Sequence, residues 1–421
     1  MAENLMRGEG SFSWNLTILA TTSAAHFIND GESAIFPVLL PPLAYYVSGS
    51  FELAAVVTCF YLFSSFASPV AVSATKNRGQ IEKGMGEGLT ILGAGIAAMG
   101  ISISMIQRFG MAAYVGVVLS ACLAGFGSSY YHPIGSSVVQ NNFPENKLGL
   151  ALGLNGSAGS LGRSLFLTLS VAAFVLEKLY GGLIILGAAC IVAALPMEIY
   201  FSRKSHLMPS ADKTAAVKRT GIRDSARLTK EIWPLLAMSI IRNLESTGIV
   251  LYLPTFFIEE GIIHYGINLG LTMTAIMALP IAGQIIVGLV SDRIGRVKTL
   301  FLTTLISGIF VLLFLLYPYN IYLDVVTLGF FSLAAFSGFP ILFPIATHMV
   351  SGDDRYLGSS LAWMSVGLGS AMSPLIIVLL SERWVLGSLY ASFAALAAAT
   401  TAASLLCFTG KIRNAGRAEE H

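Results

Sequence analysis

Long apolar stretches separated by short polar connections dominate the hydrophobic pattern of this chain. An α-helix needs roughly 20 apolar residues to cross the hydrocarbon core of a bilayer. On that basis the pattern predicts six crossings in the first half (14–47, 52–75, 84–106, 111–139, 148–176 and 179–201) and six in the second (232–258, 268–290, 299–317, 321–350, 356–380 and 384–408). The sequence therefore predicts an all-α integral membrane protein with twelve transmembrane helices.

A charged segment separates the two apolar halves. The stretch 203–231 holds eight basic and three acidic residues among its 29 positions, whereas the flanking tracts 14–202 and 232–409 are largely apolar. This division predicts three parts: an N-terminal six-helix bundle over 1–202, a cytoplasmic linker over 203–231, and a C-terminal six-helix bundle over 232–421.

Short matches relate the two halves at a shift of about 209–218 positions. Leu148-Gly149 corresponds to Leu357-Gly358, and the proline after Phe36 corresponds to the one after Leu253. Because six helices separate the copies, both copies have the same orientation in the membrane. This arrangement predicts two pseudo-symmetric bundles related by an axis along the membrane normal, with a binding cavity between them near the midplane.

The composition supports a membrane location. Charged residues make up 11% of the chain, well below the roughly 25% of an average soluble protein. The cytoplasmic ends and loops of the predicted topology hold 20 of the 25 Lys and Arg residues and the outer loops only three, which places both termini in the cytoplasm. The four cysteines are far apart within apolar tracts, and neither a metal site nor a cofactor is expected. We expect a multi-pass protein of the plasma membrane.

A loop motif follows the eighth predicted helix. The sequence from Gly288 to Lys298 contains Asp292, Arg293, Gly295 and Arg296, and it resembles the GxxxDRxGR[RK] signature of the major facilitator superfamily. The resemblance implies secondary transport by alternating access. Gly295 allows a tight turn, and Asp292 at a helix end can pair with Arg296 or face the positive N-terminus of a neighbouring helix. Either contact would hold the cytoplasmic side closed. We therefore predict a gating role for all four residues.

Two further stretches resemble a narrower branch of that superfamily. His26–Asp30 in the first helix and Gly125–Pro133 in the fourth are similar to stretches of the fosmidomycin-resistance transporters. Exporters of this branch commonly end the glycine motif of helix 5 in Gly-Pro, whereas the segment 159–167 of this chain has no Gly-Pro and contains Arg163. Drug export is therefore the alternative and not the first prediction.

Charged residues inside the bilayer cost at least ~2.5–3.5 kcal/mol each on insertion scales, so each needs a partner or a function. Thr22, His26 and Asp30 are spaced by four and share one face of the first helix, and Asn155 and Arg163 share a face of the fifth. At ~1.5 Å per residue, Asp30 and Arg163 lie at similar depth, about 24 Å from the starts of their helices. We predict that they form an ion pair.

The intramembrane charges suggest how a solute is bound. Arg163 and Arg242, one from each half, could hold an anion from opposite sides, because guanidinium groups stay charged and match carboxylate or phosphate. The other predicted substrate-binding residues are Asn155, His26, His132 and Gln284. For the coupled proton the candidates are Asp30, Glu245 and Glu32, since burial favours a neutral carboxyl until a cation or water stabilises its charge. The structural alternative is two fixed pairs, Asp30 with Arg163 and Glu245 with Arg242.

The predicted function is proton-coupled transport of a small anionic or zwitterionic organic solute by a monomer. The expected partners are this solute, protons and the lipid bilayer, and no nucleic acid. The alternatives are export of a lipophilic or drug-like compound, with recognition by Phe, Met and Tyr, and a non-transporting receptor with the same fold. An enzyme is not expected, because the sequence lacks HExxH, GxSxG, paired-aspartate and phosphate-loop motifs.

Overall fold

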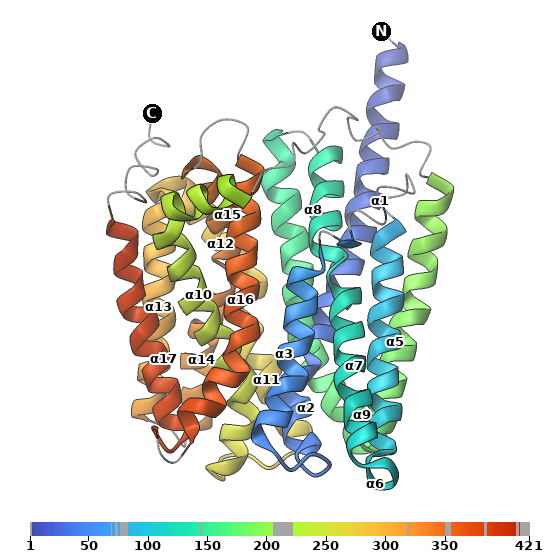
Figure 1. Ribbon diagram of the computed structural model, residues 1–421. Coiled ribbons are helices and arrows are strands. Elements are labelled where there is room, and N and C mark those ends of the chain that lie inside the picture. Colours follow the sequence, from blue (N-terminus) through green and yellow to red (C-terminus); the bar gives the residue numbers. More distant parts are fainter. Residues whose placement is uncertain are drawn as a thin grey trace.

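The protein is a bundle of long helices, and no strand occurs in the part of the chain that the computed structural model describes (Figure 1). Described are residues 2–68, 70–71, 75, 83–143, 145–204, 222–317, 320–349, 355–382, 385–409 and 412. Most of the predicted linker, 205–221, lies outside these ranges, so the boundaries at 203 and 231 stay predictions. Helix α1 begins and α17 ends on the same side of the bundle.

The first half contains six crossings, as predicted. They are built from α1 (Ala2–Ser33) with α2 (Ile35–Leu43), α3 (Ser50–Phe66), α5 (Gly84–Ser104), α7 (Met111–Ser128) with α8 (Tyr131–Asn142), and the two parts of α9 (Glu145–Lys204); the short α6 (Ile106–Phe109) connects α5 to α7. A turn at Lys178, with φ 61°, separates the two parts of α9. The sequence pattern also separates its fifth and sixth predicted crossings, 148–176 and 179–201, at this position.

The second half repeats this plan. Its crossings are α10 (Ile222–Glu259), α11 (Ile267–Ile276) with α12 (Leu279–Ile294), α13 (Arg296–Leu316), α14 (Ile321–Phe336) with α15 (Phe339–Met349), α16 (Arg355–Ser381), and α17 (Leu389–Ala403) with the 3₁₀ turn η3 (Ser404–Phe408). Among the described residues, seven continuous stretches are long and apolar enough to cross a membrane, and Ser50–Phe66 and Ile321–Phe336 are shorter apolar helices. The fold is thus two pseudo-symmetric six-helix bundles.

Several crossings are broken near prolines. The helix pairs α7–α8 and α14–α15 are interrupted just before Pro133 and Pro340, and α12 begins with Pro280 at its second position. Proline has no N–H to donate, and its ring disfavours a helical conformation in the preceding residue. Each break frees backbone carbonyls inside the bilayer, where they need donors from elsewhere in the protein.

Glycines bring the helices close together where the first bundle packs. A side chain at Gly162 of α9 would collide with the Phe27 carbonyl of α1, and one at Gly159 would collide with the His26 ring. Between α5 and the second part of α9, Gly93 and Gly187 meet backbone to backbone. Small residues at such crossings allow close packing of membrane helices. They hold α1 against α9 at the level of Asp30.

The two halves contact each other through several helix pairs. Helix α3 packs on α16, and α9 packs on α11 and α12. Ser164 and Thr274 exchange hydroxyl-to-carbonyl hydrogen bonds of 2.9 and 2.7 Å, and the Tyr265 hydroxyl donates to the Val38 carbonyl at 2.9 Å. These contacts between the halves are polar but uncharged.

Substitution of Gly162 tests this packing. We expect Gly162→Val to lower the melting temperature of the detergent-purified protein, because the new side chain forces α9 away from α1; overpacking of this kind costs about 1–3 kcal/mol. Gly149→Val in the same helix is the matched control, since nothing lies within 4 Å of a Cβ at Gly149. Equal melting temperatures for the two variants would contradict the close α1–α9 crossing.

Candidate functional site

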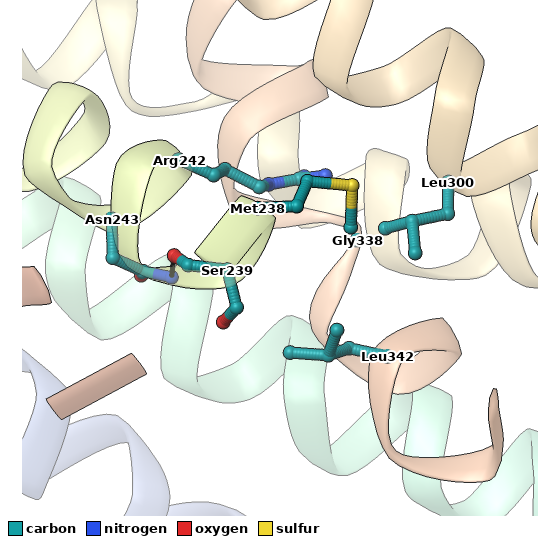
Figure 2. A pocket seen from close by; sticks show the side chains of 7 residues that line it. All are labelled: Met238, Ser239, Arg242, Asn243, Leu300, Gly338 and Leu342. Atoms are coloured by element: carbon teal, nitrogen blue, oxygen red, sulfur yellow. Dashed lines mark hydrogen bonds between the residues drawn. The ribbon is translucent and has the colours of Figure 1, made fainter. Parts of the chain in front are cut away.

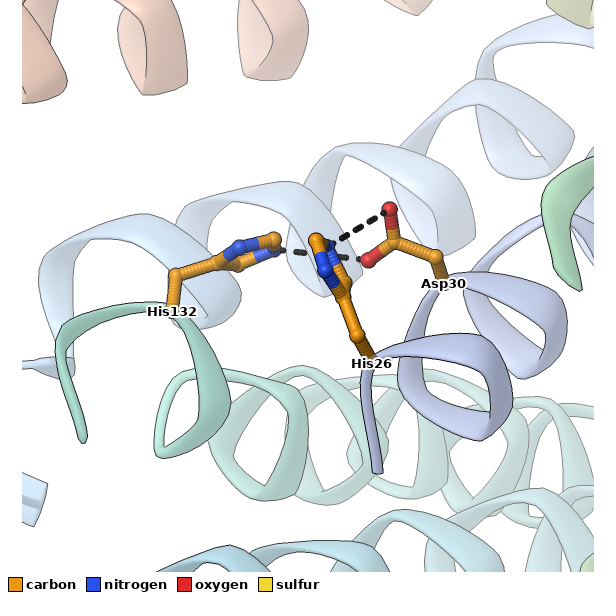
Figure 3. A group of neighbouring side chains, drawn as sticks. All are labelled: His26, Asp30 and His132. Carbon is orange, nitrogen blue, oxygen red and sulfur yellow. Dashed lines mark ion pairs between the residues drawn. The ribbon is translucent and has the colours of Figure 1, made fainter. Parts of the chain in front are cut away.

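Asp30 is the centre of a polar cluster in the first half, which we call the Asp30 cluster: Asp30, His26, His132 and Arg163. Figure 3 shows the first three of these side chains. Its Oδ2 atom lies 2.5 Å from the Arg163 guanidinium and 3.4 Å from His26 Nε2. Its Oδ1 atom lies 3.6 Å from His132 Nε2 and accepts a hydrogen bond from the Asn29 amide at 3.2 Å. The Asp30 side chain is only 5% exposed, so these donors replace water around its charge. The predicted Asp30–Arg163 ion pair is confirmed.

The His26 ring is held in one orientation. Its Nδ1 lies 2.8 Å from the Asn155 carbonyl and 3.0 Å from the Asn155 side-chain oxygen, and its ring stacks on Tyr131 at 4.6 Å. The Tyr131 hydroxyl donates to the Asn155 side-chain oxygen at 3.1 Å. Because a backbone carbonyl can only accept, Nδ1 carries a hydrogen. The Nε2 atom of His26 faces Asp30.

The second half contributes aromatic rings and an amide to this site. The Arg163 guanidinium lies 5.0 Å from the centre of the Phe336 ring, and the His132 ring lies 5.1 Å from that of Trp363. The Gln284 amide donates to the Phe336 carbonyl at 3.0 Å. His132 and Arg163 keep 33% and 24% of their side chains exposed although they lie between the halves. These two side chains of the cluster are therefore only partly buried.

His26, Asp30 and His132 also have the spacing of a metal site, with one ligand atom from each within 4.8 Å of the others. Two imidazoles and a carboxylate are a common donor set for transition metals. However, Arg163 already binds Asp30 Oδ2, and a divalent cation there would be repelled by the guanidinium. The arrangement therefore favours protons and anions over a metal ion.

Arg242 lies elsewhere, deep in the second half. Its guanidinium donates to the Ala334 and Ala335 carbonyls at 2.6 and 3.0 Å, and to the Thr303 and Thr304 hydroxyls at 3.2 and 3.0 Å. These carbonyls are the ones that the break between α14 and α15 leaves without helical donors. Arg242 thus stabilises the end of α14, and the negative end of the helix dipole stabilises its charge.

A small cavity lies beside Arg242 (Figure 2). It is lined by Met238, Ser239, Arg242, Asn243, Leu300, Gly338 and Leu342, and its volume is about 10 Å³. A single water molecule needs about 10–15 Å³ by this measure. The cavity is therefore too small for an organic solute, and a role of Arg242 in solute binding stays a prediction.

Glu245 and Glu32 are buried away from the Asp30 cluster. Glu245 accepts a hydrogen bond from Ser307 at 2.6 Å, and in the described part of the chain it is not within ion-pair distance of Arg242. The structural alternative of a fixed Glu245–Arg242 pair is therefore not seen, because the helix break offers Arg242 nearer acceptors. Glu32 faces its own bundle and is 1% exposed. The proton-coupling roles of both glutamates stay predictions.

The loop motif forms the predicted turn. Gly295 has φ 91° and separates α12 from α13, a conformation that favours glycine. Asp292 and Arg293 are exposed, and the described residues show no ion pair between Asp292 and Arg296. The gating role of Asp292, Arg293, Gly295 and Arg296 is untested by this single conformation.

The comparisons with known proteins agree with the fold. The model of the Major Facilitator Superfamily matches residues 22–270 and 262–420, so the chain belongs to this superfamily of membrane transporters. None of the curated protein sequences matches the chain significantly.

Solved structures of transporters have the same fold. A D-xylose–proton symporter has a TM-score of 0.71 at 14% identity, covering 94% of this chain and 97% of its own. The E. coli fucose:proton symporter has a TM-score of 0.64 at 15% identity, with 93% and 98% covered. The E. coli xylose transporter in an inward-open conformation has a TM-score of 0.71 at 12% identity, with 94% and 96% covered. At these identities the likeness shows the fold alone.

A double-mutant cycle tests the Asp30–Arg163 pair. We expect Arg163→Gln to lower the melting temperature strongly, because breaking a buried pair leaves an unpaired charge and costs about 3–5 kcal/mol. The double variant Asp30→Asn/Arg163→Gln should recover much of that loss. Arg108→Gln, in the exposed short helix α6, is the control and should change little. Additive losses in the double variant would show that the two side chains do not interact.

Proposed function

We propose that this protein carries a small anionic or zwitterionic organic solute across the plasma membrane, coupled to protons and by alternating access of its two bundles. The observation that supports this most is the Asp30 cluster, in which an arginine, a carboxylate and two imidazoles meet between the halves. His132 and Arg163 of this cluster are partly exposed. The other candidate residues for solute or proton binding that carry a charge, Arg242, Glu245 and Glu32, are buried.

In this proposal Arg163 binds the solute. A carboxylate or phosphate of the solute displaces Asp30 from the guanidinium, whose planar donors suit such groups. Phe336 covers one side of the guanidinium, and His132 and Gln284 lie close enough to contact the rest of the solute. Asn155 acts through His26, which it orients.

Asp30 and His26 carry the proton in this proposal. When the solute takes Arg163, Asp30 loses its nearest cation, and a bound proton restores neutrality in a site that is poor in water. The proton can be held between Asp30 Oδ2 and His26 Nε2, which lie 3.4 Å apart. Two of the structural neighbours are described as proton symporters, which agrees with coupling of this kind.

The remaining features of the proposal concern the whole molecule. Both termini are cytoplasmic, the protein acts as a monomer, and the 288–298 loop closes the cytoplasmic side through Asp292 and Arg296 when the bundles rock. Supporting observations are the excess of basic residues on that side and the Gly295 turn.

Export of a lipophilic compound, as the fosmidomycin-resistance branch suggests, is the second candidate. The observation that favours it is the pair of rings from the second half, Phe336 and Trp363, which lie against Arg163 and His132. Under this alternative the rings would bind the compound and the ion pair would stay intact. A receptor with this fold would show no flux at all.

Flux measurements in proteoliposomes distinguish these candidates. Under an imposed pH gradient, we expect organic anions or zwitterions to drive solute and proton movement. Arg163→Lys should reduce the anion response about tenfold or more, because it loses the planar fork while keeping the charge. Asp30→Asn should abolish proton movement. Arg108→Lys is the matched control.

Other outcomes would change the proposal. A response to lipophilic cations alone, unaffected by Arg163→Lys, would favour the exporter. Loss of the anion response in a folded Arg242→Ala variant would add the second arginine to the solute site.

A further inference from the structure

A second carboxyl on α1 is not explained by the Asp30 cluster. Glu32 follows Asp30 by two residues, which turns the helix by about 200° and points Glu32 into the first bundle. Its side chain is 1% exposed. Its Oε2 atom has no hydrogen-bond partner among the described residues.

The surroundings of Glu32 are apolar and tightly packed. The titratable group that faces it is Cys190, on the second part of α9, whose thiol donates to the Leu89 carbonyl of α5 instead. Nearby, α5 and α9 cross through Gly93 and Gly187, which offer no side-chain donor. No described cation or hydroxyl contacts the Glu32 carboxyl.

The repeat provides an internal comparison. Glu245 lies 213 positions later on α10, the helix that corresponds to α1, and a serine follows both glutamates. Glu245 is equally buried, yet it accepts a hydrogen bond from Ser307 and lies one turn beyond Arg242. The second half thus supplies a hydroxyl and a cation near its glutamate, and the described part of the first half supplies neither.

We propose that Glu32 is a proton-binding site inside the first bundle, distinct from Asp30, and that it is carried as the neutral acid in the folded protein. An ionised carboxylate there would be a buried charge without a partner, whereas the neutral acid costs only the desolvation of a polar group. Helix α1 then carries two carboxyls in opposite states. Asp30 is ionised beside Arg163, and Glu32 keeps its proton.

This site links stability to pH. The folded protein holds a proton at Glu32 that a solvated glutamate releases well below neutral pH. The contribution of Glu32 to stability is therefore greatest in acid and falls as the pH rises, since the unfolded state gains by releasing the proton. The Cys190 thiol, which faces Glu32, is neutral and does not offset this pH dependence.

Infrared spectroscopy of the purified full-length protein tests the proposal. At about pH 8, exposed carboxyls are ionised, so a carbonyl stretch from a protonated carboxyl reports a buried acid. We expect this band in the native protein, a loss of intensity in Glu32→Gln, and no such loss in Asp30→Asn. A native spectrum without the band would overturn the proposal, and so would a Glu32→Gln spectrum that keeps its full intensity.

Thermal melts provide a second measurement that does not depend on band assignment. The melting temperature of the native protein should fall between about pH 6 and pH 9, and Glu32→Gln should flatten this fall, because the amide has no proton to release. A parallel pH dependence in the two proteins would overturn the proposal. If Glu32→Gln does not fold, a native infrared spectrum without the protonated-carboxyl band still overturns the proposal.

Discussion

Inside a bilayer, every polar group must find its partner within the protein, and this constraint explains where the charges of this transporter lie. Arg163 and the Asn29 amide donate hydrogen bonds to Asp30, and the His26 and His132 rings lie 3.4 and 3.6 Å from its carboxyl. Arg242 meets the same requirement in reverse, since it donates to the carbonyls of Ala334 and Ala335 that a helix break has freed. Arg163 therefore neutralises a carboxylate, and Arg242 supplies hydrogen bonds to backbone carbonyls that lack helical donors.

This difference makes the two halves unequal despite their common fold. The first half holds the ionised groups that face the space between the bundles, and the second half covers them with Phe336 and Trp363. A side chain at Gly338, just after the α14 break, would collide with the Arg242 guanidinium. The second half therefore uses its arginine to shape the broken crossing that presents Phe336 to Arg163. The hydrogen bonds of Arg242 within the second bundle thus help to position Phe336, which contacts Arg163 of the first.

The apolar periodicity of the sequence and the depth of each charged residue along its helix predicted much of this arrangement. The hydrogen-bond acceptors that lie far away in the sequence could not be predicted. The twelve crossings followed from the apolar runs, and the Asp30–Arg163 pair followed from the similar depth of both residues in their helices. For Arg242 the sequence suggested Glu245, one turn away on the same helix. Arg242 instead binds the C-terminal end of α14, 92 and 93 residues later in the chain. Only the folded position of the break after α14 brings the Ala334 and Ala335 carbonyls within reach. The prolines at 340 and 344 signal a break, but no pattern says which donor will satisfy it.

The same constraint separates the roles of the two carboxyls on α1. A carboxyl that exchanges protons during transport needs a state in which its charge is supported and a route to water; Asp30 has both, through Arg163 and through the exposed edge of His132. Glu32 has neither in the described structure: it is 1% exposed, and the neighbouring Cys190 lies where α5 and α9 make close contact at Gly93, so we expect that moving its proton would require opening this contact. Rigid-body rocking of one bundle against the other does not open that contact, because it lies within one bundle. Coupling through Asp30 is therefore compatible with alternating access, whereas coupling through Glu32 would require each transport cycle to disrupt the core of the first bundle.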